Sequence, residues 1–293
     1  MTSEKMRTAH RVASELLRDR LRDVAPEMLE DIEKLTAADV IVTQGKYDHI
    51  EDVFSQSGTP FTLIDPAAID RATLRPDQII FVNCPGEFSA VGLRKLATFV
   101  AEGGYLFTTD WALKHVLEPA FPGYVEYNQQ ATRDEVVRVE VLDMQDPFLS
   151  SILGPEDDPQ WWLEGSSYPI RVLDKAKVKV LVISREIEER YGEPAVFITF
   201  DHGEGRIYHM ISHFYLQRTE TRTKRQSASS NNYLIEKGMS PELAEKYREL
   251  GADEVAVGEV ESAYVSQGVI HRMMIEKVRQ RREREKQGEQ DEA

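Results

Sequence analysis

The stretch of sequence that decides the fold runs from Val82 to Leu113 and reads VNCPGEFSAVGLRKLATFVAEGGYLFTTDWAL. Two short apolar runs, each of strand length, flank a segment whose apolar residues recur with helical spacing. Ser89 stands where a helix N-cap belongs, and the pair Gly103-Gly104 stands where the helix should stop. A helix of this length between two strands favours a crossover between parallel strands, so the stretch predicts an α/β fold.

The sequence on either side of this stretch continues the alternation of strands and helices. A helical segment over residues 47–58 ends at Gly58. Residues 195–212 form two alternating runs around the turn DHGEG, which predicts a hairpin. We expect this antiparallel pair to close the edge of a mostly parallel sheet. Further strands are expected over residues 39–44, 61–65, 78–83 and 177–186.

Both ends of the chain lie outside this pattern. Residues 1–37 predict a helical extension that Pro26 divides into two helices. Residues 119–170, rich in Pro, Asp and aromatic residues, predict an insertion that covers one end of the sheet. Residues 217–239 are polar and locally basic, which is typical of a mobile linker. Residues 240–293 predict a second helical extension.

The last helix, expected over residues 260–286, carries an apolar stripe that is too large to leave in water. We expect the stripe to pack on a protein partner or a second copy of the chain, in preference to the chain's own domain. The residues of the stripe are Tyr264, Val265, Val269, Ile270, Met273, Met274 and Val278.

Composition narrows the classes of function. A formal net charge of −15 over 293 residues argues against general binding to nucleic acid or to anionic membranes. One cysteine excludes an internal disulfide and a CxxC zinc site, and it fits a reducing compartment. The chain has no apolar run of membrane-spanning length and no leader-like N-terminal segment, so we expect a cytoplasmic protein.

Three segments together resemble the class I glutamine amidotransferase-like superfamily, and within it the ThuA-like branch. They are VIVTQGKYDHIEDVF, the stretch from Ile79 to Leu113, and GEPAVFITFDHGEGRIYHMISH. The resemblance covers about residues 38–215 and implies a domain over residues 38–216. The implied fold is a flavodoxin-like three-layer sandwich, with a mostly parallel sheet, a terminal antiparallel hairpin and helical extensions at both ends.

The resemblance also implies where chemistry would be found. In catalytic members a nucleophilic cysteine occupies the turn that corresponds here to Thr109, Asp110 and Trp111. A carboxylate is far less nucleophilic than a thiolate toward an amide. His213 matches the histidine of the family's triad, whereas Phe214 departs from the pattern. One triad position of three remains, so hydrolysis of glutamine is not expected.

In open α/β sheets the ligand crevice lies outside the carboxyl ends of the strands. The residues expected there are Gln44 to His49, Cys84 to Glu87, Asp110, Trp111 and His213. Cys84 can be interpreted in two ways. It is either a nucleophile with His213 or His49 as its base, or a small buried residue at the end of a strand. His49, Gly86, Glu87 and Trp111 are candidates for ligand binding.

Asp110 leaves three roles open: nucleophile, metal ligand, and cap of the following helical segment ALKHVL, of which the cap is favoured. A mixed metal site of Asp110, His49 and His213 has no recognised ligand spacing. We therefore expect no metal and no cofactor. Trp161 and Trp162 are adjacent and cannot both point to the same face of a strand. A purely structural role is favoured for the pair, and the alternative is one tryptophan in the core and the other exposed in a partner or ligand contact.

Three functions remain open on the sequence alone. The favoured one is a non-catalytic amidotransferase-like domain, a pseudoenzyme that serves as an interaction or scaffold subunit. The second is a hydrolase or lyase on a small polar or sugar-like substrate, with Asp110, His213 and His49 as its acid–base groups and Glu87 as a further candidate. The third is a regulatory domain that binds a small ligand in the same crevice without turning it over.

Overall fold

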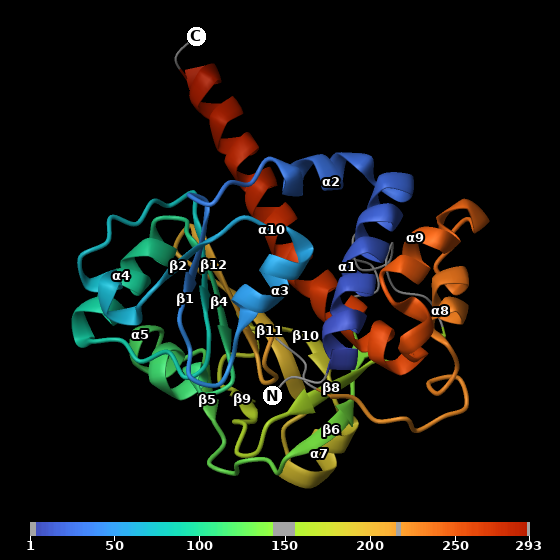
Figure 1. Ribbon diagram of the computed structural model, residues 1–293. Coiled ribbons are helices and arrows are strands. Elements are labelled where there is room, and N and C mark those ends of the chain that lie inside the picture. The colour runs from blue at the N-terminus through green and yellow to red at the C-terminus, as the bar shows by residue number, and fades with distance from the viewer. Residues whose placement is uncertain (1–3, 143–155, 215–217, 292–293) are drawn as a thin grey trace.

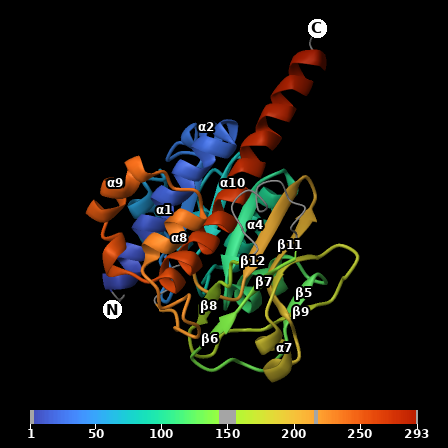
Figure 2. The same ribbon diagram turned by 90° about the vertical axis from the view of Figure 1, so that its right-hand side faces the viewer.

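The computed structural model describes residues 4–142, 156–214 and 218–291, and it confirms the α/β class (Figure 1). The described residues form a central sheet of eight strands in the order β2-β1-β3-β4-β12-β11-β10-β7. Helices lie on both faces of the sheet, as the two perpendicular views show (Figures 1 and 2). The order β2-β1-β3-β4 is that of flavodoxin-like folds, with β12 in place of their fifth strand.

The parallel half of the sheet follows the predicted strands within one or two residues. Its inner strands are apolar and buried on both faces, which is typical of parallel strands covered by helices. Ser89 caps the helix α4, since its hydroxyl accepts hydrogen bonds from the amides of Val91 and Gly92. Gly58 ends the helix α3 in the left-handed conformation, with a φ of +68°. The elements are β1 (Val40–Thr43), α3 (Ile50–Ser57), β2 (Thr62–Ile64), η1 (Pro66–Asp70), β3 (Ile79–Val82), α4 (Ala90–Ala101) and β4 (Tyr105–Thr109).

The hairpin around DHGEG is present, but its predicted place at the edge of the sheet is wrong. Strand β12 (Gly205–Met210) pairs parallel with β4, and its hairpin partner β11 (Ala195–His202) pairs antiparallel with β10 (Lys179–Ile183). The short strand β7 (Glu140–Val141) then forms the edge. Both hairpin strands are buried on both faces over most of their length, which suits the interior of a sheet. A helix, α7 (Arg185–Tyr191), connects β10 to β11.

The predicted insertion packs as two small antiparallel sheets, while its residues 143–155 lie outside the described residues. Trp161 and Trp162 of β8 are both buried, so the alternative in which one of them is exposed is wrong. Trp161 packs on Phe197 of β11, whereas Trp162 meets the ring of His213 edge to face. The elements are η2 (Leu113–Leu117), α5 (Glu118–Ala120), β5 (Val125–Tyr127), β6 (Glu135–Arg138), β8 (Gln160–Leu163) and β9 (Ile170–Val172), with β5 paired to β9 and β6 to β8.

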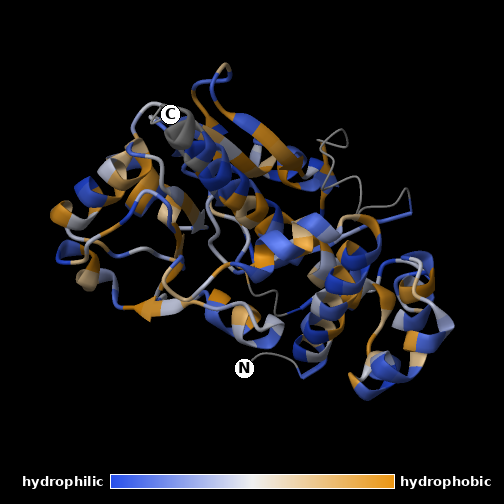
Figure 3. Ribbon diagram, turned by 90° about the horizontal axis from the view of Figure 1, so that it is seen from above, coloured by the Kyte–Doolittle hydropathy of each residue, from blue (hydrophilic) through white to orange (hydrophobic). Residues whose placement is uncertain are grey.

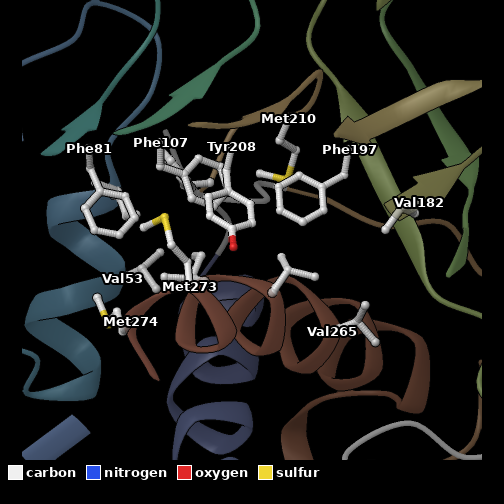
Figure 4. Close-up of a cluster of buried hydrophobic side chains, with 14 of the residues drawn as sticks. Val53, Phe81, Phe107, Val182, Phe197, Tyr208, Met210, Val265, Met273 and Met274 are labelled. Carbon is white, nitrogen blue, oxygen red and sulfur yellow. The ribbon is translucent and has the colours of Figure 1, made fainter. Parts of the chain in front are cut away.

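The two helical extensions pack on each other and on one face of the sheet. Helices α1 (Glu4–Val24) and α2 (Pro26–Glu33) divide at Pro26 as predicted. Figure 4 shows Phe81, Phe107 and Tyr208 pointing from the sheet toward the last helix, α10 (Val257–Asp291), which carries Met273. In Figure 3 the helices show hydrophilic and hydrophobic residues side by side. The remaining elements are α8 (Ser230–Glu236), η3 (Pro241–Leu243), α9 (Ala244–Glu249) and η4 (Ala252–Glu254).

The apolar stripe of α10 is buried within the chain itself. Its seven predicted residues are each at most 6% exposed. The expectation that a partner or a second copy covers these side chains is therefore wrong. Burial of one such side chain stabilises the fold by about 1.5–3 kcal/mol. The stripe therefore stabilises the packing of α10 on the aromatic face of the chain's own sheet, and not an interface with a partner.

The segment predicted as a mobile linker, residues 217–239, contains a helix in its described part. Gln217 lies outside the described residues. Helix α8 fills residues 230–236, and two arginines fix the chain before it. Arg222 lies 2.5 Å from Glu186, and Arg225 lies 2.8 Å from the buried Glu261 of α10. The local basic charge that suggested a solvated linker is thus used in ion pairs. No helix among the described residues is both long and apolar enough to cross a membrane.

Candidate functional site

Three turns at the carboxyl edge of the sheet bring a thiol, a carboxylate and an imidazole together. Cys84 follows β3, Asp110 follows β4 and His213 follows β12, and these three strands are neighbours in the sheet. One side-chain atom of each residue lies within 4.8 Å of the others, and all three residues are buried. Residues 84, 110 and 213 are far apart in sequence, so the parallel pairing of the strands creates this contact.

Asp110 is held in an unusual backbone conformation. Its φ is +43°, in the left-handed region that residues other than glycine rarely occupy. Its Oδ1 accepts a hydrogen bond from the amide of Tyr168 at 2.8 Å, and its Oδ2 accepts one from the hydroxyl of Ser167 at 3.1 Å. No helix amide is capped by this side chain, so the favoured reading as a cap is wrong. The insertion supplies both donors, and they fix the carboxylate toward the site.

His213 lies between two carboxylates. Its Nε2 is 3.4 Å from Oδ2 of Asp110, and its Nδ1 is 3.0 Å from Oε2 of Glu164. Within the described residues, neither ring nitrogen has a partner in hydrogen-bond geometry, although the side chain is 3% exposed. Burial works to lower the pKa of His213, but the contacts with Asp110, Cys84 and Glu164 outweigh it and hold the pKa well above its usual range.

Cys84 presents its thiol to the same space. Burial is the main reason that its pKa rises to about 11, while the neighbouring His213 opposes the rise. A free site at neutral pH therefore holds the thiol, which is a weak nucleophile compared with a thiolate. The carbonyl of Cys84 accepts hydrogen bonds from the amides of Lys46 and Tyr47, which ties the turn after β1 to this edge.

A cavity of about 130 Å³ opens onto these groups. A cavity of this volume holds several water molecules or the end of a small molecule. Aromatic rings form one wall: Trp111 stacks on Tyr168 at 5.5 Å between centroids and meets Tyr47 edge to face at 5.2 Å. The lining residues are Tyr47, Cys84, Asp110, Trp111, Glu164, Gly165 and His213.

Of the four residues expected to bind a ligand, Trp111 lines the cavity and three do not. His49 is 44% exposed, and its Nδ1 lies 3.1 Å from Glu51. Glu87 forms an exposed ion pair with Lys46 at 2.6 Å. Gly86 has a φ of +75°, and a Cβ there would come within 2.7 Å of Val116, so its role is to let the turn pack closely.

Sequence reasoning did not single out two carboxylates of the site. Glu164 reaches it from the insertion, at the end of β8, where nothing in WWLEG signals a function. Asp48 is buried behind it and accepts hydrogen bonds from the hydroxyl of Thr109 at 2.7 Å and from the amide of Phe214. Asp48 could have been found from its position, because it lies in the turn after the first parallel strand. That turn must face the same carboxyl edge of the sheet as the turns that carry Cys84, Asp110 and His213.

Larger hollows lie elsewhere on the described surface. One of them, of about 580 Å³, is lined by Arg190 and Arg222. Arg190 pairs with Glu135, and Arg222 lies 3.1 Å from Glu220. The cavity at the carboxyl edge of the sheet differs because its ionisable groups face one another and the opening.

Comparisons with known proteins bear on the fold alone. No family model matches the chain, and no curated protein matches it. Solved structures that resemble it include a glutamine amidotransferase from Thermotoga maritima, with 12% identity over 81% of this chain and 97% of that one and a TM-score of 0.45. A putative ThuA-like protein from Bacteroides uniformis has 12% identity over 69% and 90% of the two chains, with a TM-score of 0.42.

An exo-β-1,4-mannosidase from an Opitutaceae bacterium, strain TAV5, is also similar, with 9% identity and a TM-score of 0.43. The match covers 75% of this chain and 35% of the mannosidase. At such identities and TM-scores these similarities carry no argument about this chain. The function has to be argued from the site.

Proposed function

We propose that this chain is an acid–base enzyme, a hydrolase or lyase, that acts on the reacting end of a small polar substrate. The observation that supports the proposal best is the convergence of Cys84, Asp110 and His213 on one cavity. Ionisable side chains within reach of one another at an opening are the usual composition of a catalytic site. The interaction role that we favoured from sequence relied on the stripe of α10, which the chain uses itself.

Each group has a role in this proposal. His213 transfers the proton, because its ring faces the cavity and is backed by carboxylates. Asp110 orients the ring and holds its charge, while Ser167 and Tyr168 hold Asp110. Glu164 is 39% exposed and lies 3.0 Å from Nδ1, so it connects the buried ring with solvent. Trp111 and Tyr47 hold the apolar side of the substrate.

We also propose that this chain is related to amidotransferase-like domains of the ThuA-like branch and that it acts in the cytoplasm. The proposed chemistry does not include hydrolysis of glutamine. Asp110 occupies the turn after β4 where the resemblance places a nucleophilic cysteine, and its left-handed φ supports that correspondence. Cys84 lies on the neighbouring turn after β3. A thiol displaced by one strand cannot use the same donors for an amide carbonyl.

The test is a panel of small esters, lactones, amides and glutamine, assayed with wild-type protein and with His213→Gln. We expect turnover of a small polar ester or lactone, a loss of at least about 100-fold in His213→Gln, and no release of ammonia from glutamine. His115→Gln, on the exposed part of η2, is the matched control. Equal rates in wild type and His213→Gln, or no turnover across the panel, would exclude the proposal.

A second candidate, an interaction subunit, has one observation in its favour. The C-terminal end of α10 projects beyond the body of the protein in both ribbon views (Figures 1 and 2). The sequence after Arg284 reads EKQGEQDEA and is mostly acidic. Ending the chain after Arg284 would remove this end and spare the buried stripe. A larger mass for the full chain than for the shortened one, by light scattering, would support self-association.

A further inference from the structure

We infer that Cys84, Asp110 and His213 form a binding site for one transition-metal ion, and that the ion is Zn²⁺. The inference rests on the proposed function and the same cavity, and it changes one role: while the ion is bound, Nε2 of His213 is a ligand, and the ion in place of the ring activates the reacting group. Ion binding is measured without a substrate. Three donor atoms of three chemical kinds meet here within 4.8 Å of one another. Thiolate sulfur, imidazole nitrogen and carboxylate oxygen are the ligands that Zn²⁺ prefers in proteins.

The spacing of the donor atoms fits such an ion. Ligands at about 2.0–2.3 Å from a tetrahedral Zn²⁺ lie about 3.3–3.8 Å from one another. Nε2 of His213 and Oδ2 of Asp110 are already 3.4 Å apart. The sulfur of Cys84 lies within 4.8 Å of the other two donors, so a shift of at most about 1–1.5 Å would bring it to ligand spacing.

The unpartnered ring of His213 is an independent observation that points to a ligand. In the part of the chain that the structure describes, both of its nitrogens lack a hydrogen bond although the ring is buried. An unsatisfied polar group in such a place is unfavourable by about 1–3 kcal/mol. An ion bound at Nε2 would satisfy one nitrogen. Glu164, 3.0 Å from Nδ1, would then accept the proton of the other and fix the ring.

The other two ligands have supports of the same kind. Ser167 and the amide of Tyr168 hold the carboxylate of Asp110, as outer partners hold ligating carboxylates in metal proteins. Ionised Cys84 and Asp110 carry two negative charges, which a divalent cation cancels. Binding replaces the thiol proton of Cys84, which passes to solvent.

The chemistry of the donors selects the metal. Sulfur and nitrogen donors exclude Mg²⁺ and Ca²⁺, which require oxygen. Three protein ligands leave a fourth position open, and the cavity of about 130 Å³ lies beside them. This is the ligand count of catalytic zinc sites, whereas structural sites are closed by a fourth residue.

Cobalt substitution tests the site with the full chain. Protein stripped with a chelator is titrated with Co²⁺ and then with Zn²⁺. We expect one Co²⁺ per chain, a visible spectrum of tetrahedral type, a sulfur-to-cobalt charge-transfer band, and displacement by one Zn²⁺. Absence of the sulfur band in wild-type protein overturns the inference, and this result needs no variant.

Variants then assign the ligands. Cys84→Ser, Asp110→Asn and His213→Gln should each weaken Zn²⁺ binding by more than about 100-fold, and Glu164→Gln by about 10–100-fold. His115→Gln should bind as wild type does, and circular dichroism confirms that each variant is folded. Unchanged affinity in folded Cys84→Ser or His213→Gln overturns the assignment. Metal binding without turnover would refute the proposed reaction and leave the site standing, and turnover without metal binding would do the reverse.

Discussion

Charged side chains in two regions of the protein, beneath α10 and at the carboxyl edge of the sheet, are satisfied differently. Beneath α10, Glu276 contacts the hydroxyl of Tyr208 and lies 2.9 Å from Arg272 and 3.3 Å from Arg206. At the carboxyl edge, His213 and Glu164 face each other without a hydrogen bond among the described residues. The first region is satisfied within the described residues, whereas in the second region polar atoms of His213 and Glu164 have no hydrogen bond there.

The difference shows which region stabilises the protein. Satisfied buried charges beside an apolar helix face add to the free energy of unfolding or leave it unchanged, whereas unsatisfied ones reduce it. A reduced free energy of unfolding of this kind is common in sites that bind or convert other molecules. Stability should therefore depend on the contacts of α10, and binding on the carboxyl edge.

The largest expected effect comes from the apolar contacts of α10. Ile270 is 1% exposed, whereas Ile235, on α8, is 64% exposed. Ile270→Ala should lower the free energy of unfolding by about 2–5 kcal/mol, because it leaves a cavity under the helix. Ile235→Ala should lower it by less than about 0.5 kcal/mol. Urea unfolding of both variants gives the measurement, and equal effects would contradict a stabilising role for α10.

A matched pair of glutamates tests the two regions directly. Glu276→Leu removes the shared partner of Tyr208, Arg272 and Arg206, and should lower the free energy of unfolding by about 2–3 kcal/mol. Glu164→Leu removes an unsatisfied carboxylate, so we expect a change within about 1 kcal/mol, of either sign. The comparison is wrong if Glu164→Leu destabilises the protein more than Glu276→Leu does.

The smallest effect is a dependence on pH. Burial lowers the pKa of His271 on α10 to about 4, below the value of about 6.5 in an unfolded chain. Between these values the unfolded state binds the extra proton, so stability falls as the pH falls from about 6.5 toward 4. Between pH 7 and pH 5, His271→Gln should lose about 1–2 kcal/mol less than wild type. His115→Gln should lose as much as wild type, and a loss in His271→Gln equal to that of wild type would contradict the prediction.

Much of the fold could be predicted from short-range signals. Apolar runs of four or five residues, the cap at Ser89 and the stop at Gly58 each depend on nearby residues, and the structure has all of them. The position of the hairpin could not be predicted in this way. Pairing of β12 with β4 joins residues about a hundred positions apart, and the sequence of neither strand specifies which strand it pairs with. The same is true of α10, whose stripe predicts burial but not the surface that buries it.

For the candidate site, too, the features that depend on nearby residues could be predicted and those that depend on distant residues could not. Cys84, Asp110 and His213 could be placed at one edge because each follows a strand of a parallel sheet. Their mutual contact was not predicted, since it depends on adjacent strands and on turn geometry such as the φ of +43° at Asp110. Glu164 was missed because it comes from an insertion with no repeating pattern, and His49 was over-valued because its ring turns outward.

The central place of β12 and the cover formed by α10 have a consequence for synthesis. The ribosome must reach residue 210 before the parallel sheet can acquire its fifth strand, and it must pass residue 274 before α10 can cover Phe81, Phe107 and Tyr208. Helix α1, made before the sheet, packs against α10, made after it. Such high contact order slows folding and leaves an aromatic face open on the nascent chain. We therefore expect this protein to depend on chaperones during translation far more than after it.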